Sequence, residues 1–265
     1  MKKKVLMFFM TLVVIFSFGF NILSFAEEDN KEEENQKKVV YLTFDDGPSK
    51  VTLKTLKVLD DENVKATFFV VGKMAESYPE ILKEVLDAGH NICIHTYSHE
   101  NSIYKSKEAY FKDYDKATEV LKELLNEDVS KFMRMPGGSS TTIPEKNTLK
   151  AIRDELDNRG LYYVDWNVTI EDALGCNIPP AELIKNYTKG MNRKGLDTSN
   201  VIILMHDGGG NKTTPEALKY IIKDLKEKGY EFKTFSDVTD NEVNKLMEGR
   251  IINRYNRGVS CDNPK

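Results

Sequence analysis

Two adjacent carboxylates, Asp45 and Asp46, end the first apolar run of the chain in the stretch VVYLTFDDGP. Neighbouring like charges repel one another, and neither acid can be buried without a partner. Aspartate and Gly-Pro pairs are also common in turns, so a solvated turn would explain the stretch by itself. A chemical role is therefore predicted only if other reactive groups converge on these two acids.

Histidine is scarce in this chain, and two of the four histidines, His95 and His99, lie four residues apart. On one helical turn this spacing places both imidazoles on the same side, which suits a single metal ion. A surface pair on a helix is the alternative interpretation. His206 follows another apolar run, whereas His90, next to Gly89, is expected to have a structural role.

A metal ion would explain why the acids and the histidines occur together. A catalytic zinc typically takes three His, Asp or Glu ligands and keeps one position for water. One of Asp45 and Asp46 can complete the set begun by His95 and His99, while the other acts as a base near the water. The charge of the ion offsets the repulsion between the acids and lowers the pKa of its water to about 7. These ligands suit zinc, and cobalt or nickel tolerate the same set.

Other polar residues extend this site. His206 could protonate a leaving group, or it could be a loop histidine with a satisfied hydrogen bond. Arg134 could hold a carboxylate in a fixed fork of hydrogen bonds, or it could be a surface charge at a turn. The glycines that follow it, among them Gly137, allow an exposed N–H to face an oxyanion. Trp166, the only tryptophan, could line a sugar-stacking surface or belong to the core.

The elements that must position these groups alternate along the chain. Short apolar runs rich in Val, Ile, Phe and Tyr occupy residues 39–44, 66–71, 91–95, 132–135, 161–167, 201–205 and 230–235. Segments with helical spacing occupy residues 51–61, 81–88, 107–125, 146–159, 180–191 and 213–228.

About seven strands alternating with about six helices predict parallel βαβ units in one α/β domain. A (β/α) barrel with about seven strands fits this pattern, and an open doubly wound sheet is the alternative. Both architectures place the working face at the carboxyl ends of the strands. Asp45, His95, Arg134 and His206 all fall at such ends, so we expect them to meet.

The N-terminal segment has the features of an export signal. Lysines at positions 2–4 precede a long apolar run, and residues 24–26 (SFA) form an A-x-A-like cleavage site. This pattern predicts a signal peptide over residues 1–26, with an uncleaved membrane anchor as the alternative. Residues 27–38 lack apolar side chains and are expected to form a charged linker. The catalytic domain is then expected at 39–240, with a polar tail at 241–265, in a secreted or extracytoplasmic, membrane- or cell-wall-associated protein.

Charge and cysteine content argue against nucleic acid as the main partner and against a fold held by a complete set of disulfides. With 38 basic and 42 acidic residues, the chain lacks the positive excess of a protein whose main partner is nucleic acid. Three cysteines cannot form a complete disulfide framework. Cys93 lies in an apolar run and is expected to be a buried thiol, while a Cys176–Cys261 disulfide is left open.

Five short motifs, taken in order, resemble those of the polysaccharide deacetylases, carbohydrate esterase family 4. They are TFDDGP (43–48), HTYSH (95–99), RMPGG (134–138), DWNVTIEDA (165–173) and LMHDG (204–208), and the resemblance covers about residues 39–235. The first two together are highly specific, and the fourth is the weakest.

The resemblance implies a distorted (β/α) barrel that removes N-acetyl groups from a polysaccharide with a divalent metal, zinc in the first place. The implied metal ligands are Asp46, His95 and His99. The implied catalytic residues are Asp45 as base, His206 as acid, Arg134 orienting Asp45 and Asp172 supporting His206. The implied substrate-binding residues are Gly137, whose N–H would face the oxyanion, and Leu204 in the acetyl pocket. Tyr97 and Trp166 are further candidate substrate-binding residues.

Three positions depart from the common pattern of that family. Ala173 stands where tryptophan is frequent, Gly137 where a bulky aromatic residue often follows the proline, and Cys93 where glycine is frequent. None of these changes removes an implied ligand, base or acid. We therefore expect them to affect the acetyl pocket and substrate range more than the type of reaction.

An exported deacetylase is expected to act on the wall of its own cell. N-acetylglucosamine of peptidoglycan is the leading predicted substrate, with chitin oligosaccharides or N-acetylmuramic acid as alternatives. A non-catalytic module that binds wall glycan is a hypothesis of another class. A metalloprotease would need the glutamate of an H-E-x-x-H helix, which the HTYSH stretch lacks.

Overall fold

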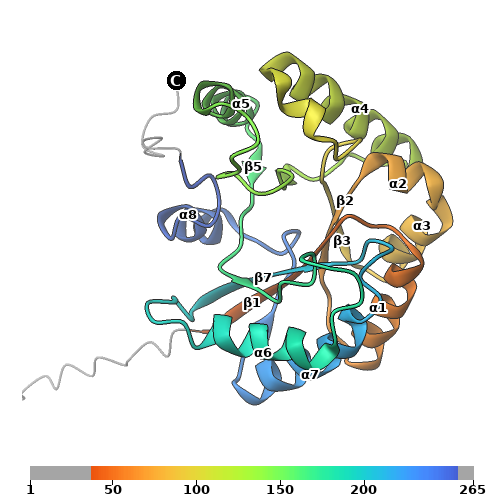
Figure 1. Cartoon of the computed structure of the whole chain (residues 1–265), viewed down its shortest axis with the longest axis vertical. Coiled ribbons are helices and arrows are strands. Elements are labelled where there is room, and N and C mark those ends of the chain that lie inside the picture. The colour runs from red at the N-terminus through yellow and green to blue at the C-terminus, as the bar shows by residue number, and fades with distance from the viewer. Residues whose placement is uncertain (1–36, 256–265) are drawn as a thin grey trace, which may run out of the picture. The chain divides into compact units, whose positions relative to one another are not determined.

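Parallel strand pairing organises the part of the chain that the computed structural model describes, residues 37–255. The strands are β1 (Val39–Asp45), β2 (Thr67–Val70), β3 (Asn91–Ile94), β4 (Phe132–Met133), β5 (Tyr162–Tyr163), β6 (Val168–Thr169), β7 (Asn200–His206) and β8 (Glu231–Phe232). Seven of them follow the order β5-β4-β3-β2-β1-β7-β6, and β8 pairs with β1. All pairings between these strands are parallel, and the sheet curls into a half-barrel, as predicted (Figure 1).

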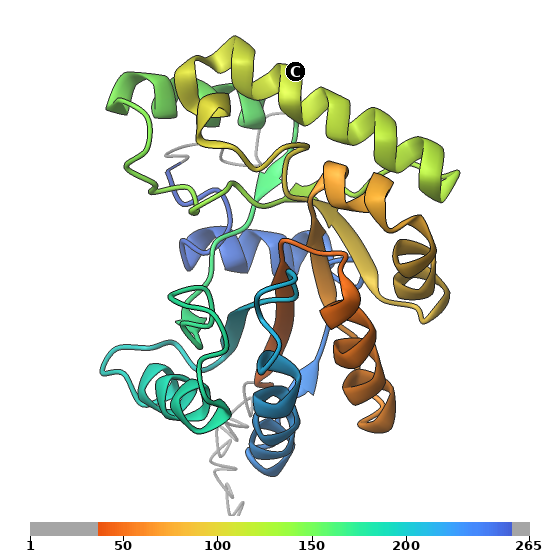
Figure 2. The same ribbon diagram turned by 45° about the vertical axis from the view of Figure 1, so that its right-hand side comes forward.

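All helices except the last one lie around the outside of the strands (Figures 1 and 2), and the structure describes eight α-helices and one 3₁₀ helix within residues 37–255. They are α1 (Lys50–Asp61), α2 (Gly72–Ser77), α3 (Pro79–Asp87), α4 (Lys107–Leu125), α5 (Lys146–Asn158), α6 (Pro180–Met191), α7 (Thr214–Glu227) and α8 (Asp240–Glu248), with a 3₁₀ helix η1 (Asn101–Lys105) before α4. Side chains at their first residues explain several boundaries. Ser49 caps α1, Ser106 caps α4, and proline opens α3 and α6, where a missing N–H costs nothing.

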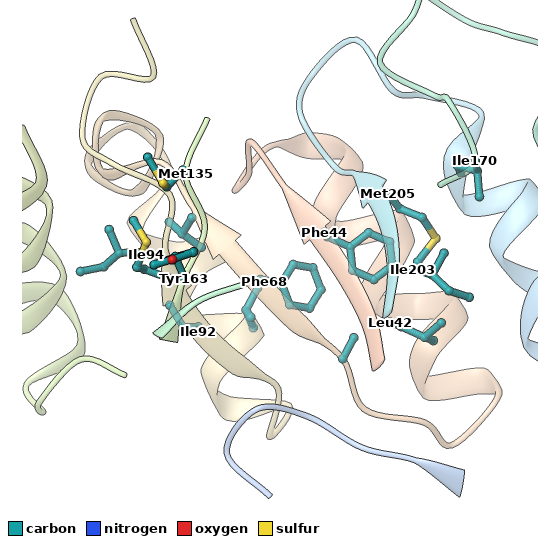
Figure 3. Close-up of a cluster of buried hydrophobic side chains, with 14 of the residues drawn as sticks. Leu42, Phe44, Phe68, Ile92, Ile94, Met135, Tyr163, Ile170, Ile203 and Met205 are labelled. Atoms are coloured by element: carbon teal, nitrogen blue, oxygen red, sulfur yellow. The ribbon is translucent and has the colours of Figure 1, made fainter. Parts of the chain in front are cut away.

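Alternate residues of β1 belong to two different hydrophobic clusters, because successive side chains of a strand point to opposite faces. Val40, Leu42 and Phe44 pack towards the outer helices. Figure 3 shows part of that cluster, in which the rings of Phe44 and Phe68 lie with centroids 5.1 Å apart. Tyr41 belongs to the second cluster, on the other face. Both faces of the sheet are therefore buried, which explains the nearly unbroken apolar runs.

The second cluster includes residues that the sequence analysis placed in a polar tail. Helix α8 begins with a capping box between Thr239 and Glu242, and its Val243 and Leu246 are buried. Ile252, beyond the helix, is also buried in this cluster. The folded domain therefore continues past residue 240, and α8 closes the face of the sheet that the outer helices leave open.

The segment 161–167, expected to be one strand, is divided in the structure. Residues 162–163 pair with β4 at one end of the sheet, and the chain then crosses to β6 at the other end. Between them, Val164 makes an antiparallel bridge to Ile252. The side chain of Asn167 also accepts from the backbone N–H of Ile202 at 2.8 Å, so a side chain replaces a strand pairing there.

No helix within residues 37–255 is both long enough and apolar enough to span a bilayer. The predicted signal peptide or anchor at 1–26, and all but the last two residues of the predicted linker, lie outside the described residues.

Candidate active site

The two acids after β1 have different backbone conformations and therefore different neighbours. Asp45 is the last residue of β1, in register with His206 of β7, and is buried. Asp46 follows with a left-handed φ of 74°, and its Oδ1 lies 3.6 Å from His95 Nε2 and 3.3 Å from His99 Nε2. Because the backbone turns between the two acids, the Asp46 carboxylate lies beside the two histidines.

His95 follows β3 and presents one defined nitrogen to the site. Its Nδ1 lies 2.8 Å from the backbone carbonyl of Arg134, which can only accept, so Nδ1 carries the proton. Nε2 is then free to bind a cation. Burial, with help from the neighbouring His99, lowers the pKa of His95 to about 3, which keeps the ring neutral, as a metal ligand must be.

His99 does not share a helix with His95, contrary to the basis of the sequence prediction. Residues 95–100 form a loop between β3 and η1, in which Thr96 and His99 have left-handed φ values of 66° and 57°. The loop nevertheless brings the two imidazole centroids to 4.9 Å. The residues that the sequence paired do meet, through backbone turns rather than helical periodicity.

These three side chains fit a divalent cation. One ligand atom from each of Asp46, His95 and His99 can be chosen so that all lie within 4.8 Å of one another. Asp46 Oδ1 is buried and has no hydrogen-bond partner within the described residues, although a buried carboxylate oxygen without a partner is costly. A cation between the carboxylate and the two Nε2 atoms would remove that cost, and two histidines with one aspartate form a set that zinc accepts.

Arg134 holds the other acid. Its Nη1 donates to Asp45 Oδ1 at 2.8 Å and to Thr43 Oγ1 at 2.9 Å. Nε donates to the carbonyl of Val164 at 3.0 Å, and Nη2 to that of Asp165 at 3.3 Å. The guanidinium is fully buried, so the surface-charge interpretation is excluded.

Asp45 has the burial and the free carboxylate oxygen expected of a candidate base. Burial raises the pKa of Asp45, and the charge of Arg134 opposes that effect without cancelling it. Its Oδ1 is taken by Arg134, whereas Oδ2 lies 3.6 Å from His95 Nε2 and faces the candidate metal site. A carboxylate held by one oxygen can receive a proton at the other.

His206 and Asp172 form a second pair at the carboxyl end of β7. His206 Nδ1 lies 2.8 Å from Asp172 Oδ1, and the His206 backbone N–H donates to Oδ2 at 2.8 Å. Thr214 Oγ1 also donates to Oδ2, at 2.7 Å. Burial alone would lower the pKa of His206, but the hydrogen bond and charge of Asp172 outweigh it and raise that pKa to about 9. The ring is therefore protonated at neutral pH.

The predicted substrate-binding residues have mixed surroundings. Gly137 is exposed with a left-handed φ of 74°, and its N–H has no hydrogen-bond acceptor within the described residues. Leu204 is buried in β7, and Tyr97 is half-buried with its hydroxyl bonded to Glu76. Trp166 is half-buried, and a Cβ at Gly138 would lie 3.0 Å from its ring.

Asp207 is a site neighbour that the sequence analysis missed. Its Oδ2 accepts from Thr52 Oγ1 at 2.5 Å, its carbonyl accepts from Ser49 Oγ at 2.6 Å, and its N–H donates to the Asp45 carbonyl at 3.0 Å. These bonds tie the start of α1 to the ends of β7 and β1. A side chain at Gly47 would overlap the carboxylate, whose pKa burial raises to about 7. The sequence signal that could have identified Asp207 was its position between His206 and Gly208 at the end of a predicted strand.

The structure also places the remaining histidine, two of the cysteines and Ala173. His90 is structural: it is buried, and its Nδ1 accepts from the Ala66 N–H at 3.2 Å. Cys93 is a buried thiol, as expected. Cys176 is exposed, and Cys261 lies outside the described residues. Ala173 is exposed beside Asp172, so it supplies no large wall.

Comparison with known proteins gives consistent matches. A family model described as polysaccharide deacetylase matches residues 32–155. A peptidoglycan-N-acetylglucosamine deacetylase of Bacillus cereus is 31% identical over 209 residues, which cover 78% of this chain and 91% of that protein.

Solved structures also match. The catalytic domain of a peptidoglycan N-acetylglucosamine deacetylase from Eubacterium rectale has a TM-score of 0.67 and 35% identity, covering 77% of this chain and 89% of that one. A mutant of a CE4 family pseudoenzyme of Bacillus anthracis, with restored enzymatic activity, has a TM-score of 0.61 and 25% identity, covering 76% and 67% of the two chains.

Proposed function

The chain belongs to the polysaccharide deacetylase family, and on this premise we propose that it is a metal-dependent enzyme that removes N-acetyl groups from peptidoglycan. The observation that carries the metal dependence is Asp46 Oδ1, which is buried, has no hydrogen-bond partner among residues 37–255 and lies near two imidazole Nε2 atoms. N-acetylglucosamine is the proposed sugar, because the similar proteins named above act on it.

Asp46, His95 and His99 would hold the ion, and zinc is the proposed metal. When bound, such an ion polarises the acetamide carbonyl and lowers the pKa of a water molecule to about 7. The protein prepares the ligands in advance, since His95 is kept neutral and its Nδ1 proton is fixed by the Arg134 carbonyl.

Asp45 is proposed to accept the proton of the attacking water. Its free oxygen, Oδ2, faces the metal ligands, and Arg134 fixes the orientation of the carboxylate through Oδ1. Burial raises the pKa of Asp45, which makes it a stronger base than an exposed aspartate. As the oxygen of water adds to the carbonyl carbon, the Gly137 N–H, which has no protein acceptor within the described residues, is available to the oxyanion.

His206 is proposed to protonate the departing amine. With a pKa of about 9 it carries a proton at neutral pH, and its Nδ1 is occupied by Asp172. Nε2 is then the nitrogen that can donate. When the carbon–nitrogen bond breaks, the proton passes to the sugar nitrogen, and acetate leaves with the oxygen from water.

We further propose that the protein acts outside the cytoplasm. The basic and apolar N-terminal sequence supports export, with residues 1–26 as a cleaved signal or a membrane anchor. A wall glycan is accessible to an enzyme in that location.

Acetate release from N-acetylated peptidoglycan tests the proposal. The protein is assayed with zinc, after chelation, and as Asp45→Asn; chitin oligosaccharides serve as the second substrate. Release that needs both the metal and Asp45 supports the deacetylase. Glycan binding without release from either substrate, in protein that still binds metal, supports the binding module instead.

A further inference from the structure

The loop that carries His99 is held by a carboxylate from helix α4, the next α-helix along the chain. Asp113, on α4, accepts two backbone hydrogen bonds with one oxygen: Oδ1 lies 2.7 Å from the N of Tyr97 and 3.1 Å from the N of Ser98. The aspartate is half-buried, and it lies 14 residues beyond His99 in the sequence.

His99 depends on this loop more than His95 does. His95 is buried at the end of β3, and a backbone carbonyl fixes its ring. The His99 side chain is 39% exposed, and within residues 37–255 its ring has no polar contact other than the one with Asp46. Apart from Asp46 and the ring of His95, the position of this imidazole therefore depends on the backbone from Thr96 to His99.

That backbone is in a conformation that needs support. Thr96 and His99 have φ values of 66° and 57°, in the left-handed region that side chains disfavour, and Thr96 is β-branched as well. Such a loop persists only where its surroundings specify it. The bonds to the loop are therefore part of what places His99.

Two elements supply that support from different groups of the loop. The first N–H groups of α2, from Gly72 and Lys73, donate to the carbonyls of Thr96 and Tyr97 at 3.0 and 2.9 Å. Asp113 accepts from the N–H groups of the same stretch. The ring of Tyr97 is held separately, since Lys116 Nζ lies 3.5 Å from its centroid. Asp113 therefore acts on the backbone of the loop.

We propose that Asp113 is a positioning residue for His99: by accepting the Tyr97 and Ser98 N–H groups it sets the imidazole at metal-binding distance from Asp46 and His95. The proposal rests on the metal site of the proposed function. It predicts that loss of the acceptor weakens metal binding, while loss of charge alone does not.

Four variants of the full chain separate these effects. Asp113→Ala removes the acceptor, and Asp113→Asn keeps a carbonyl oxygen in its place without the charge. Asp113→Glu keeps the charge but displaces the acceptor. Asp115→Ala is the matched control. It removes a carboxylate of the same helix, but this carboxylate pairs with Arg159 at 2.6 Å and does not bind the loop.

The readout is the affinity for Co²⁺, measured by competition with a chromophoric chelator, with the visible spectrum of the bound cobalt and the thermal midpoint of the metal-free protein. Loss of a group that orients a metal ligand typically weakens affinity by about 10- to 100-fold. We expect that loss for Asp113→Ala and Asp113→Glu, with Asp113→Asn and Asp115→Ala within about threefold of the unmodified protein. A change in the cobalt spectrum should accompany the loss.

The outcomes are decisive. Unchanged cobalt affinity in folded Asp113→Ala, or an asparagine variant as weak as the alanine variant, overturns the proposal. If Asp113→Ala does not fold, the contrast between asparagine and glutamate still decides it. The proposed function fails separately, if the unmodified protein binds cobalt but releases no acetate from glycan.

Discussion

Replacing Asp172 by asparagine should move the alkaline limit of activity, because Asp172 is the group that keeps His206 protonated. Folding raises the pKa of His206 from an ordinary value of 6.5 to about 9 against the effect of burial. One pKa unit corresponds to about 1.4 kcal/mol, so the surroundings favour the imidazolium by about 3 kcal/mol. Without the Asp172 charge and hydrogen bond, only Asp45 and Asp46 oppose the effect of burial, so the pKa of His206 should fall towards its ordinary value of 6.5.

The expected kinetic effect follows from the protonated fraction of His206. At pH 7.5 nearly all of the unmodified protein carries the proton on His206, whereas only about a tenth of the Asp172→Asn variant does when the pKa returns fully to 6.5. The ratio kcat/KM reports the free enzyme, so it should fall by up to about tenfold at pH 7.5, with the alkaline limb displaced to lower pH. The assay is acetate release from pH 5.5 to 10, with Asp87→Asn, an exposed partner of Lys83, as control.

The same pair makes stability depend on pH. A group whose pKa is raised by folding stabilises the folded state fully below its unfolded pKa, and loses that effect as the pH rises through the folded value. His206 should therefore contribute about 3 kcal/mol below pH 6.5, and this contribution should be lost as the pH rises through 9. Urea unfolding of the metal-free protein at pH 6 and 9.5 measures this contribution.

The kinetic experiment decides the role of His206. If the alkaline limb of kcat/KM lies at the same pH in the unmodified protein and in Asp172→Asn, the assignment of His206 as the acid is refuted.

Three other changes test separate parts of the structure. Asp46→Ala should abolish stoichiometric zinc binding in a protein that keeps its thermal midpoint, as calorimetric titration of the metal-free protein would show; undiminished binding would contradict the proposed ligand set. Arg134→Met leaves Asp45 buried without its partner and should lower the free energy of unfolding by about 3–5 kcal/mol in urea titrations at pH 7, with a smaller loss at acid pH, where Asp45 is protonated. Leu246→Ala should lower the free energy of unfolding by about 2–5 kcal/mol in the same titration, because this side chain is 1% exposed in the core. A change near zero would show that α8 is not part of the folded core.

The pattern of the sequence predicted the sheet well because burial on both faces leaves a strong signal. Strand β1 reads as one apolar run since its alternate residues pack in two clusters. Helices α4 and α6 were bounded correctly, where serine and proline mark their first residues. Helix α8 was missed because its apolar residues are few among charged ones, and only contact with the inner cluster makes them core.

The candidate site was predicted from residues at the carboxyl ends of strands. In a parallel sheet these ends lie at one edge, independently of the conformation of the loops. Asp45, His95 and His206 needed no more than that, because parallel strands share one carboxyl edge. Asp113 could not be found in this way. It makes its contact from the middle of a helix to the backbone N–H groups of a loop, and neither partner has a side-chain signature.

The division of roles between the two adjacent acids depends on one backbone angle. In an extended strand, neighbouring side chains point to opposite faces, so Asp45 and Asp46 could not both serve one site there. The left-handed φ of Asp46 ends the strand and turns its carboxylate to the two Nε2 atoms, while Asp45 stays in register beside His206. Asp45 is buried against Arg134, which fixes the orientation of its carboxylate. Asp46 has an oxygen without a protein partner in the described residues, which suits a ligand. The geometry therefore favours Asp45 as base and Asp46 as ligand over the reverse, a choice that residue type and spacing left open.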